Sequence, residues 1–396
     1  GGDDLAVIAV GGYGRGEMAP YSDIDIMILM PKNVTAAHTK FIEFMLYILW
    51  DLGLKIGHST RSISESIAAA RGDHTVLTSL LEMRHVAGDK MLWTRLSRSI
   101  QREIAKQKPL TFVEEKLSER DIRHKRFGDT RYVVEPNVKD GKGGLRDLHS
   151  LFWIAKYAYR ANSIIDIVKQ GLLRESEARK FALAQRFLWT VRCHLHFYAD
   201  RSEERLDFEA QMIIAQRLGF ADRGGMRGVE RFMKRYYLAV RNVGSLTRIF
   251  CATMETDFRK SLDFWRPDFL KAHDLYPFRI ESGRVSLIED ALFRDEPIRL
   301  IELFGIAHTH DADVHPSTLQ RVTRSLSAID DKIRNDFRSN HQFLDILTSK
   351  KNPERVLRLM NESGVFGKFL PDFGRIVAMM QFDMYHSYTV DEHTLK

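Results

Sequence analysis

Cysteine is scarce in this sequence, with two residues in 396. Cys193 and Cys251 have no second cysteine or histidine at metal-ligand spacing, and both lie in segments with helical periodicity. A disulfide framework or a structural zinc site is therefore not expected to hold the fold together. Isolated thiols suit a reducing compartment, so we expect a cytoplasmic protein.

Long apolar runs are also missing. The most apolar stretch, FIEFMLYILW at 41–50, is too short to cross a bilayer and carries an acidic residue near its start. The N-terminus lacks the basic end of a secretory signal peptide. We expect no membrane association and no targeting segment. Because the chain begins almost inside an apolar strand and ends just after a distinctive histidine, we expect both ends to be cut from a longer protein.

No dense block of basic residues occurs, although Lys and Arg outnumber Asp and Glu by 60 to 53, a formal net charge of +7. A nucleic-acid-binding surface needs such a block, or a basic track interleaved with stacking aromatic residues, and the sequence concentrates neither. Nucleic acid is therefore not expected as a partner. The surplus charge would suit a nucleotide or an acidic protein.

Strand signals are concentrated in the first hundred residues. Apolar stretches at 5–10, 23–30 and 54–60 predict strands, and a helix is predicted over about 36–52. From about Phe112 onward a 3.6-residue periodicity prevails, which predicts helices. The expected fold class is α+β, with a small α/β domain followed by a mostly α-helical region.

The most distinctive stretch is GGYGRGEMAPYSDIDIMIL at 11–29, in which a glycine pair follows an apolar strand and two aspartates enter the next one. Gly11 and Gly12 allow a turn at positive φ and keep side chains away from a ligand that the backbone must approach. Phosphate oxygens are such a ligand, because a helix that starts near Gly12 would direct its free N–H groups at them. Arg15 would add charged donors.

Asp23 and Asp25 share one face of their predicted strand, while Ile24 and Ile26 face the core. Two adjacent carboxylates repel each other unless a cation lies between them, and oxygen ligands at this spacing suit Mg²⁺ that also binds nucleotide phosphates. An isolated Asp-x-Asp more often marks solvated acids at a strand edge. The preceding glycine pair reverses that preference and predicts a metal site for phosphoryl or nucleotidyl transfer.

This pattern resembles the polymerase-β-type nucleotidyltransferase superfamily, in which Gly-Gly or Gly-Ser follows one strand and Asp-x-Asp lies on the next. Two further stretches sharpen the resemblance: EPNVKDGKGGLRDLHSLFWIAKY at 135–157 and MMQFDMYHSYTVDEHTL at 379–395. Together the three look like the bacterial bifunctional uridylyltransferase/uridylyl-removing enzymes, which modify the nitrogen-signalling protein PII. The first stretch is shared with other nucleotidyltransferases, whereas the other two are narrow.

The resemblance implies Mg²⁺-dependent transfer of UMP from UTP to a tyrosine hydroxyl of PII, with release of pyrophosphate. It implies that Gly11 and Gly12 hold the triphosphate, with Arg15 nearby, and that the catalytic residues Asp23 and Asp25 hold the metal. Ser22 would cap the turn or bind phosphate, and the alternative interpretation is an ordinary turn serine. A preference for UTP over ATP does not follow from the sequence.

The general base is left unassigned. Members of this fold usually carry a third carboxylate on a later strand, but the matching stretch LKIGHST has His58 where an acid might stand. Asp73 or Glu82 could reach the site, although solvated acids on a helix face are the favoured interpretation of both.

The loop VKDGKGGLRD leads into an amphipathic helix and carries Lys139, Lys142 and Arg146. One interpretation is a basic lip over the triphosphate or over a loop of PII. The other is an ordinary helix N-terminus with solvated basic neighbours. The sequence does not choose between them.

The resemblance also divides the chain into parts. We expect a nucleotidyltransferase domain at 1–110, a helical domain at 111–265, a mainly helical connecting region at 266–375 and the beginning of an HD phosphohydrolase domain at 376–396. Within 266–287, Pro and Gly interrupt the helical pattern, and a small hairpin could fit there. In the helical domain, Arg192 and His196 share a helix face, where a buried polar tie between helices is favoured over catalysis.

The last residues, HSYTVDEHTLK, resemble the opening of an HD-type metal phosphohydrolase domain, with His393 as its early histidine. No His-Asp doublet follows. His273–Asp274, His308 and His310 precede the motif and are expected in loops. We therefore expect the hydrolase half to be missing from this chain, together with the sensing domains through which glutamine would act on the full-length protein.

Two other functions are considered. A transferase acting on RNA ends or on a small acceptor would need the basic track that the sequence lacks. A non-catalytic regulatory protein would have a decayed nucleotide pocket, and the intact Gly11, Gly12, Asp23 and Asp25 argue against decay.

Overall fold

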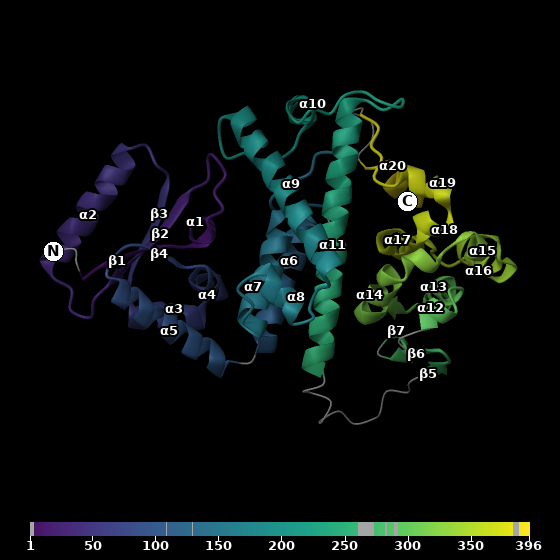
Figure 1. The fold of residues 1–396 in the computed structure, drawn as a ribbon, viewed down its shortest axis with the longest axis horizontal. Coiled ribbons are helices and arrows are strands. Elements are labelled where there is room, and N and C mark those ends of the chain that lie inside the picture. Colours follow the sequence, from purple (N-terminus) through teal and green to yellow (C-terminus); the bar gives the residue numbers. More distant parts are fainter. Residues whose placement is uncertain are drawn as a thin grey trace. The chain divides into compact units, whose positions relative to one another are not determined.

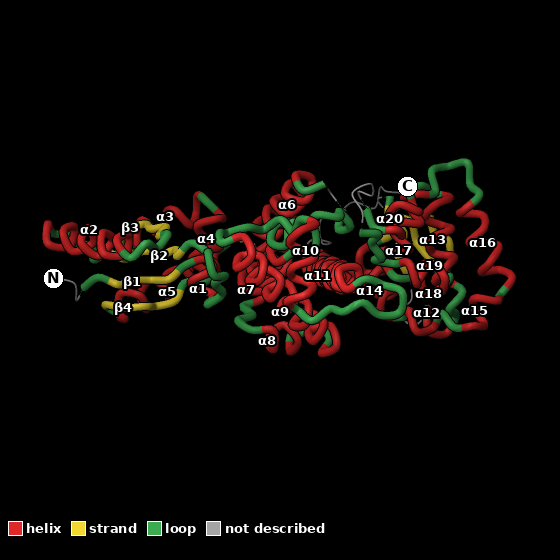
Figure 2. The backbone as a smooth tube through the Cα atoms, turned by 90° about the horizontal axis from the view of Figure 1, so that it is seen from above, coloured by secondary structure: helices red, strands yellow, loops and turns green. Residues whose placement is uncertain are grey.

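The structure is a computed structural model of the chain. It describes residues 4–107, 109–128, 130–259, 273–281, 283–288, 292–382 and 388–396. The chain folds as two compact units, the first made of 1–121, 152–163 and 192–204, and the second of 122–151, 164–191 and 205–396. Strands and helices occur in both, so the predicted α+β class is confirmed; Figure 2 shows the strands in yellow. The four domain ranges expected from the sequence stay predictions.

The first unit is built on a four-stranded sheet of order β3-β2-β1-β4. Strand β1 pairs antiparallel with both β2 and β4, and β2 pairs parallel with β3. The elements of residues 1–106 are, in chain order, β1 (Ala6–Ala9), α1 (Gly11–Arg15), β2 (Ile24–Met30), α2 (Ala36–Asp51), β3 (Ile56–Ser62), α3 (Ile63–Gly72), α4 (His74–Leu81), β4 (Arg84–Gly88) and α5 (Lys90–Lys106).

The two faces of β2 are covered by different helices, and Figure 1 shows α2 on one side of the sheet and α3 and α5 on the other. Ile26 and Ile28 pack with Ile42 and Leu46 of α2. Met27, which points the opposite way, receives the hydroxyl of Ser66 from α3 at 3.9 Å. Because side chains alternate along a strand, the residues on the Met27 side include Asp25.

The middle of the chain is helical, as the periodicity predicts. Its helices are α6 (Pro109–Arg126), α7 (Leu145–Tyr159), α8 (Ile164–Lys169), α9 (Glu175–Ala199), α10 (Phe208–Arg217) and α11 (Gly228–Arg259). Residues of α6, α7 and α9 contribute to both units.

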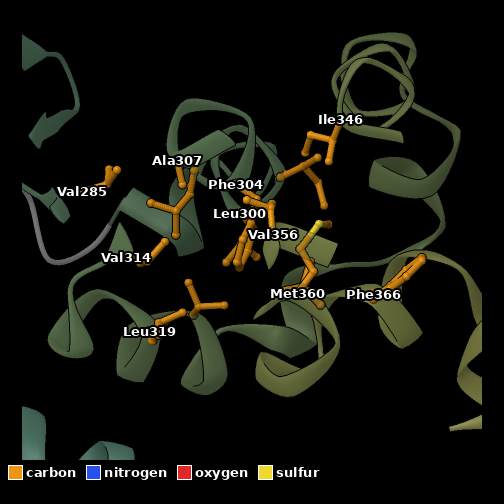
Figure 3. Close-up of a cluster of buried hydrophobic side chains, with 14 of the residues drawn as sticks. Val285, Leu300, Phe304, Ala307, Val314, Leu319, Ile346, Val356, Met360 and Phe366 are labelled. Carbon is orange, nitrogen blue, oxygen red and sulfur yellow. The ribbon is translucent and has the colours of Figure 1, made fainter. Parts of the chain in front are cut away.

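The last part of the second unit combines a small sheet with short helices. Its elements are β5 (His273–Leu275), β6 (Phe278–Glu281), β7 (Arg284–Leu287), α12 (Leu292–Asp295), α13 (Arg299–Thr309), β8 (Asp313–Val314), α14 (Pro316–Arg324), the 3₁₀ helix η2 (Leu326–Ala328), α15 (Asp331–Asn335), α16 (Phe337–Leu347), α17 (Glu354–Ser363), α18 (Val365–Phe369), α19 (Pro371–Ile376) and α20 (Val390–Leu395). Figure 3 shows its core, in which Leu300 and Phe304 of α13 lie among side chains from β7, α14, α16 and α17.

This region confirms one expectation and corrects another. The hairpin anticipated within 266–287 is present as the antiparallel pair β6 and β7. The loop placement of the histidines is wrong for two of the three positions, because His273–Asp274 belong to β5 and His308 lies in α13. His310 directly follows that helix. The backbone pairing of β5 with β6 and the apolar packing of α13 explain why these segments are ordered elements.

Candidate active site

The carboxylate of Asp25 lies between two glycines. A Cβ atom placed on Gly57 would lie 2.5 Å from Oδ1 of Asp25, and one placed on Gly11 would lie 3.1 Å from Oδ2. Gly57 is the register partner of Asp25 on β3. Side chains at these two positions would push the carboxylate aside, so the glycines keep it in place at the start of β2.

The two glycines after β1 differ in backbone conformation, whereas the sequence predicted a turn at positive φ for the pair. Gly11 has a φ of +56°, in the left-handed region that favours glycine, whereas Gly12 does not have a positive φ. A Cβ on Gly12 would instead lie 3.1 Å from the carbonyl oxygen of Glu17. Backbone strain therefore applies to Gly11, and close packing applies to Gly12.

Asp23 precedes β2 by one residue and is exposed, and Asp25 is half-buried. Both lie on the same side of the backbone because they are two residues apart in extended chain. Mg²⁺ typically takes one or two carboxylates and completes its shell with phosphate oxygens and water. The two carboxylates, with the glycine cradle that fixes one of them, fit this ion as a donor set.

The turn that leads into Asp23 is closed by Ser22. The Ser22 hydroxyl accepts the N–H of Ala19 at 3.1 Å, and the Ser22 N–H donates to the Ala19 carbonyl at 3.0 Å. The capping contact suggested for Ser22 by the sequence is present in the structure. A phosphate contact of Ser22 stays a prediction.

Residues in and after α9 also contact the turn that precedes Asp23. The Nδ1 atom of His196 accepts the backbone N–H of Tyr21 at 3.3 Å, and the Tyr21 hydroxyl contacts the Asp200 carboxylate. Nε2 of His196 lies 3.5 Å from Glu204, whose carboxylate is bound by Arg192 at 2.6–3.0 Å. The expected polar tie is present, but it joins a helix to the turn before Asp23 rather than two helices.

Arg15 is engaged by carboxylates. Its guanidinium binds Glu17 at 3.1 Å and also Glu82, which accepts the indole N–H of Trp153 at 2.5 Å. Burial raises the pKa of Glu82, against the opposing effects of Arg15 and Trp153. The interpretation of Glu82 as a solvated acid is wrong, because its side chain is 1% exposed. Nucleotide binding by Arg15 stays a prediction.

Asp73 and His58 make other contacts in the structure. Asp73 caps α4 and accepts the N–H of Thr75 at 2.6 Å, which lowers its pKa. His58 is the register partner of Ile26 and so faces α2, where its ring centroid lies 5.9 Å from that of Trp50. The position of His58 is therefore on the face opposite to Asp25, and the general base is still unassigned.

The loop that precedes α7 is compact in a way that its glycines explain. A Cβ on Gly143, whose φ is +85°, would lie 2.5 Å from the carbonyl oxygen of Val240 in α11. The buried Asp147 accepts the Gly143 N–H at 2.8 Å and is bound by Arg123 at 2.5 Å and His124 at 2.9 Å. Burial alone would raise the pKa of Asp147, but these partners lower it. The Gly-Gly-x-x-Asp pattern therefore fixes the loop conformation.

The chain is similar to known proteins in three places. Residues 1–76 match the family model of a nucleotidyltransferase domain, 111–251 that of the GlnD PII-uridylyltransferase, and 278–369 that of the uridylyltransferase GlnD third domain. All 396 residues align with bifunctional uridylyltransferase/uridylyl-removing enzymes, at 50% identity in Rhodospirillum rubrum and 49% in Azospirillum brasilense and Novosphingobium aromaticivorans. The chain is therefore similar to enzymes of this family over its whole length. It spans 42–43% of the length of these relatives.

The third stretch that resembles the uridylyltransferase family lies partly outside the described residues, at 383–387. His393 is exposed on α20, whereas the neighbouring Asp391 is buried and accepts bonds from Asn361 at 3.0 Å and from the Ala378 N–H at 3.1 Å. In the part of the chain that the structure describes, no three His, Cys, Asp or Glu side chains gather as a metal site. The HD assignment of His393 stays a prediction.

Among the residues that the structure describes, no helix is both long enough and apolar enough to span a bilayer.

Proposed function

We propose that this chain carries the transferase activity of a PII uridylyltransferase, moving UMP from UTP to a tyrosine hydroxyl of PII. The observation that supports it most directly is the pair Asp23 and Asp25 beside the glycine turn, with the Asp25 carboxylate held between Gly11 and Gly57. The similarity to the relatives adds support, because they are named for this activity.

In the proposed reaction the phenol oxygen of the PII tyrosine forms a bond to the α-phosphorus of UTP. The bond from that phosphorus to the β-phosphate oxygen breaks, pyrophosphate leaves and the phenol proton is released. Asp23 and Asp25 would hold Mg²⁺, which would neutralise the charge that develops on the phosphates. Gly11 and Gly12 allow the phosphates to approach the backbone, and Ser22 and His196 keep the acidic turn in place.

The relatives' names include a uridylyl-removing activity. For a longer protein that contains this chain we propose the same second activity, through an HD domain that begins near His393, and a response to glutamine. The scarcity of cysteine, with two residues in 396, supports a cytoplasmic location for it.

The test is incubation of the purified chain with PII, UTP and Mg²⁺, followed by mass measurement of intact PII. The expected result is a mass increase of one UMP on each modified PII subunit. A parallel incubation with ATP measures base selection. Absence of any modified PII from a folded chain, under conditions in which a full-length family member modifies it, would contradict the proposal.

A further inference from the structure

The guanidinium group of Arg15 lies beside the glycine turn that follows β1. A Cβ atom placed on Gly12 would lie 3.9 Å from Nη2 of Arg15, and one placed on Gly11 would lie 3.1 Å from Oδ2 of Asp25. The turn is therefore close to a cation at one glycine and to a carboxylate at the other. This arrangement suits a metal-bound triphosphate, because the metal binds carboxylates while the other phosphate oxygens bind cations.

The three nitrogen atoms of the Arg15 side chain have different surroundings. Nε donates to Glu17 at 3.1 Å, and Nη1 donates to the carboxylate of Glu82. Nη2 donates no hydrogen bond to any residue that the structure describes, and the side chain as a whole is 14% exposed. The nitrogen beside Gly12 is therefore the one whose N–H groups remain available to a ligand.

Glu82 is a buried residue with both carboxylate oxygens engaged. Its side chain is 1% exposed, Oε1 accepts the indole N–H of Trp153 at 2.5 Å, and Oε2 accepts the bond from Arg15. The guanidinium carbon of Arg15 lies 5.9 Å from the centroid of the Trp153 ring, within the range of a cation–π contact. Trp153 therefore contacts both members of the ion pair and restricts where they can lie.

The backbone of Glu82 also contacts α1, the short helix that ends at Arg15. A Cβ atom placed on Gly14 would lie 2.3 Å from the carbonyl oxygen of Glu82 and 3.0 Å from that of Ala9. The helix therefore packs directly on the chain at position 82. Backbone and side chain of one residue thus fix both the helix and the guanidinium at its end. All of these residues, and Trp153, belong to the first unit.

We propose that Glu82 is a positioning residue for nucleotide binding, which through Arg15 directs the Nη2 atom at the phosphates of a nucleoside triphosphate. This inference rests on the proposed function, because it takes the glycine turn as the triphosphate site. A flexible arginine loses side-chain entropy when it binds a ligand, and holding it in one geometry beforehand lowers that cost. Charge alone predicts the opposite effect, because a carboxylate near the site repels phosphate.

The experiment is a double-mutant cycle on the affinity for UTP, measured by isothermal titration calorimetry of the whole chain with UTP and Mg²⁺ and without PII. Glu82→Gln keeps the size of the side chain, but an amide has a single acceptor oxygen and cannot accept from both Trp153 and Arg15. We expect the affinity to fall at least about fivefold. Arg15→Met should lower it at least about tenfold, because a charged donor to phosphate is lost.

The double variant decides whether Glu82 acts through Arg15. In the Arg15→Met background, Glu82→Gln should change the affinity less than about twofold, because the group that Glu82 positions is absent. The matched control is Glu103→Gln, which takes a carboxylate from another arginine of the same unit, Arg71, at 2.8 and 2.9 Å. It should also change the affinity less than about twofold, since independent sites do not couple.

Circular dichroism and thermal unfolding check that each variant is folded. If Glu82→Gln does not fold, Glu82→Asp takes its place in the cycle: it keeps the charge but is one methylene group shorter, so its oxygens lie farther from Arg15, and the same coupling is expected. An affinity equal to or above that of the parent chain would overturn the proposal. A loss of equal size with and without Arg15 would also overturn it, because a purely structural role has that result.

The two proposals fail in different ways. A parent chain that binds UTP with the expected coupling but does not modify PII supports the positioning role of Glu82 and contradicts transfer to PII. A parent chain that modifies PII but shows no coupling between Glu82 and Arg15 contradicts the positioning role alone. A folded parent chain that binds no UTP contradicts both.

Discussion

At the scale of single residues, Asp25 depends on the absence of side chains around it. Gly11 and Gly57 come from different elements, yet each leaves room for one oxygen of the same carboxylate. The sequence pattern predicts the importance of Gly11, because it follows a strand and precedes the aspartates. It does not predict Gly57, because the contact depends on the parallel register of β2 and β3.

Gly57→Ala tests this cradle. Gly57 does not have a positive φ, so alanine suits the backbone, but its Cβ would lie 2.5 Å from Oδ1 of Asp25. We expect the carboxylate to move and UMP transfer to fall at least about tenfold, which corresponds to about 1.4 kcal/mol in the barrier. The measurement is the rate of PII modification.

Gly72→Ala serves as the control, since a Cβ there has no described atom within 4 Å and the residue does not have a positive φ. It should leave the rate unchanged. Equal rates in Gly57→Ala and the parent chain would show that the cradle does not position Asp25.

The interpretation of Glu82 as a solvated acid failed because the side chain is buried, whereas Asp73 is exposed. Glu82 and Asp73 look alike in sequence, as acids near helix ends, but one is buried against Arg15 and Trp153 and the other caps α4. The local sequence pattern around Glu82 does not show that the distant Trp153 contacts it or that packing excludes water from it. Such long-range partners are a property of the fold and cannot be read from spacing.

At the scale of elements, the sequence predicted the strands and helices that have a strong apolar pattern. The strands expected at 5–10, 23–30 and 54–60 correspond to β1, β2 and β3. Strand β4, with the sequence RHVAG, was missed because most of its residues are exposed and it lies at a sheet edge. Strand β4 forms because its backbone pairs with β1, although its own sequence lacks an alternating apolar pattern. The pairing includes an irregularity between Val7 and Ile8.

The link between α9 and the acidic turn gives an element-scale prediction. His196→Leu removes the acceptor for the Tyr21 N–H and leaves that donor without its partner, so the turn before Asp23 should loosen. We expect a higher Mg²⁺ concentration for half-maximal UMP transfer and a rate at least about fivefold lower, since a lost hydrogen bond is worth roughly 1 kcal/mol.

His196→Asn keeps an acceptor near the place of Nδ1 and is the matched variant. It should restore most of the Mg²⁺ response. If both variants require the same Mg²⁺ concentration as the parent chain and differ only in thermal stability, then His196 supports the fold without positioning the acidic pair.

The cluster of Arg131, Arg248 and Glu362, in which the carboxylate binds the two arginines at 3.1 and 2.6 Å, joins a loop, α11 and α17, and predicts a pH dependence. The pKa of Glu362 is about 2 in the folded protein, below its ordinary value of 4.5. Its contribution to stability is present above pH 4.5 and is lost as the pH falls from 4.5 toward 2.

In that window the free energy of unfolding of the second unit should fall by at most about 1.4 kcal/mol per pH unit through this group. The measurement is urea unfolding at several pH values, compared with Glu362→Gln. The variant should be less stable at pH 7 and should have a shallower pH dependence below pH 4.5. Identical slopes in the two proteins would show that Glu362 does not titrate in this way.

At the scale of the whole molecule, the similarity to a family could be predicted from the sequence, but the complete second sheet could not. The similarity to this family was predictable because three separated motifs occur in order along the chain. The first lies within the family-model match at 1–76 and the second within the match at 111–251. The small sheet of β5 to β8 was only partly predictable, since a hairpin was anticipated but its partners β5 and β8 were not. Short strands carry too few residues for a clear alternating pattern.

The central claim is that Asp23 and Asp25 carry nucleotidyl transfer to PII. The most direct measurement is the rate of UMP incorporation into PII by the parent chain, by Asp25→Asn and by Asp51→Asn, which removes an exposed acid at the end of α2. The account predicts at least about a hundredfold loss in Asp25→Asn, because charge stabilisation by a bound metal is worth several kcal/mol, and an unchanged rate in Asp51→Asn. Equal rates in all three proteins would contradict it.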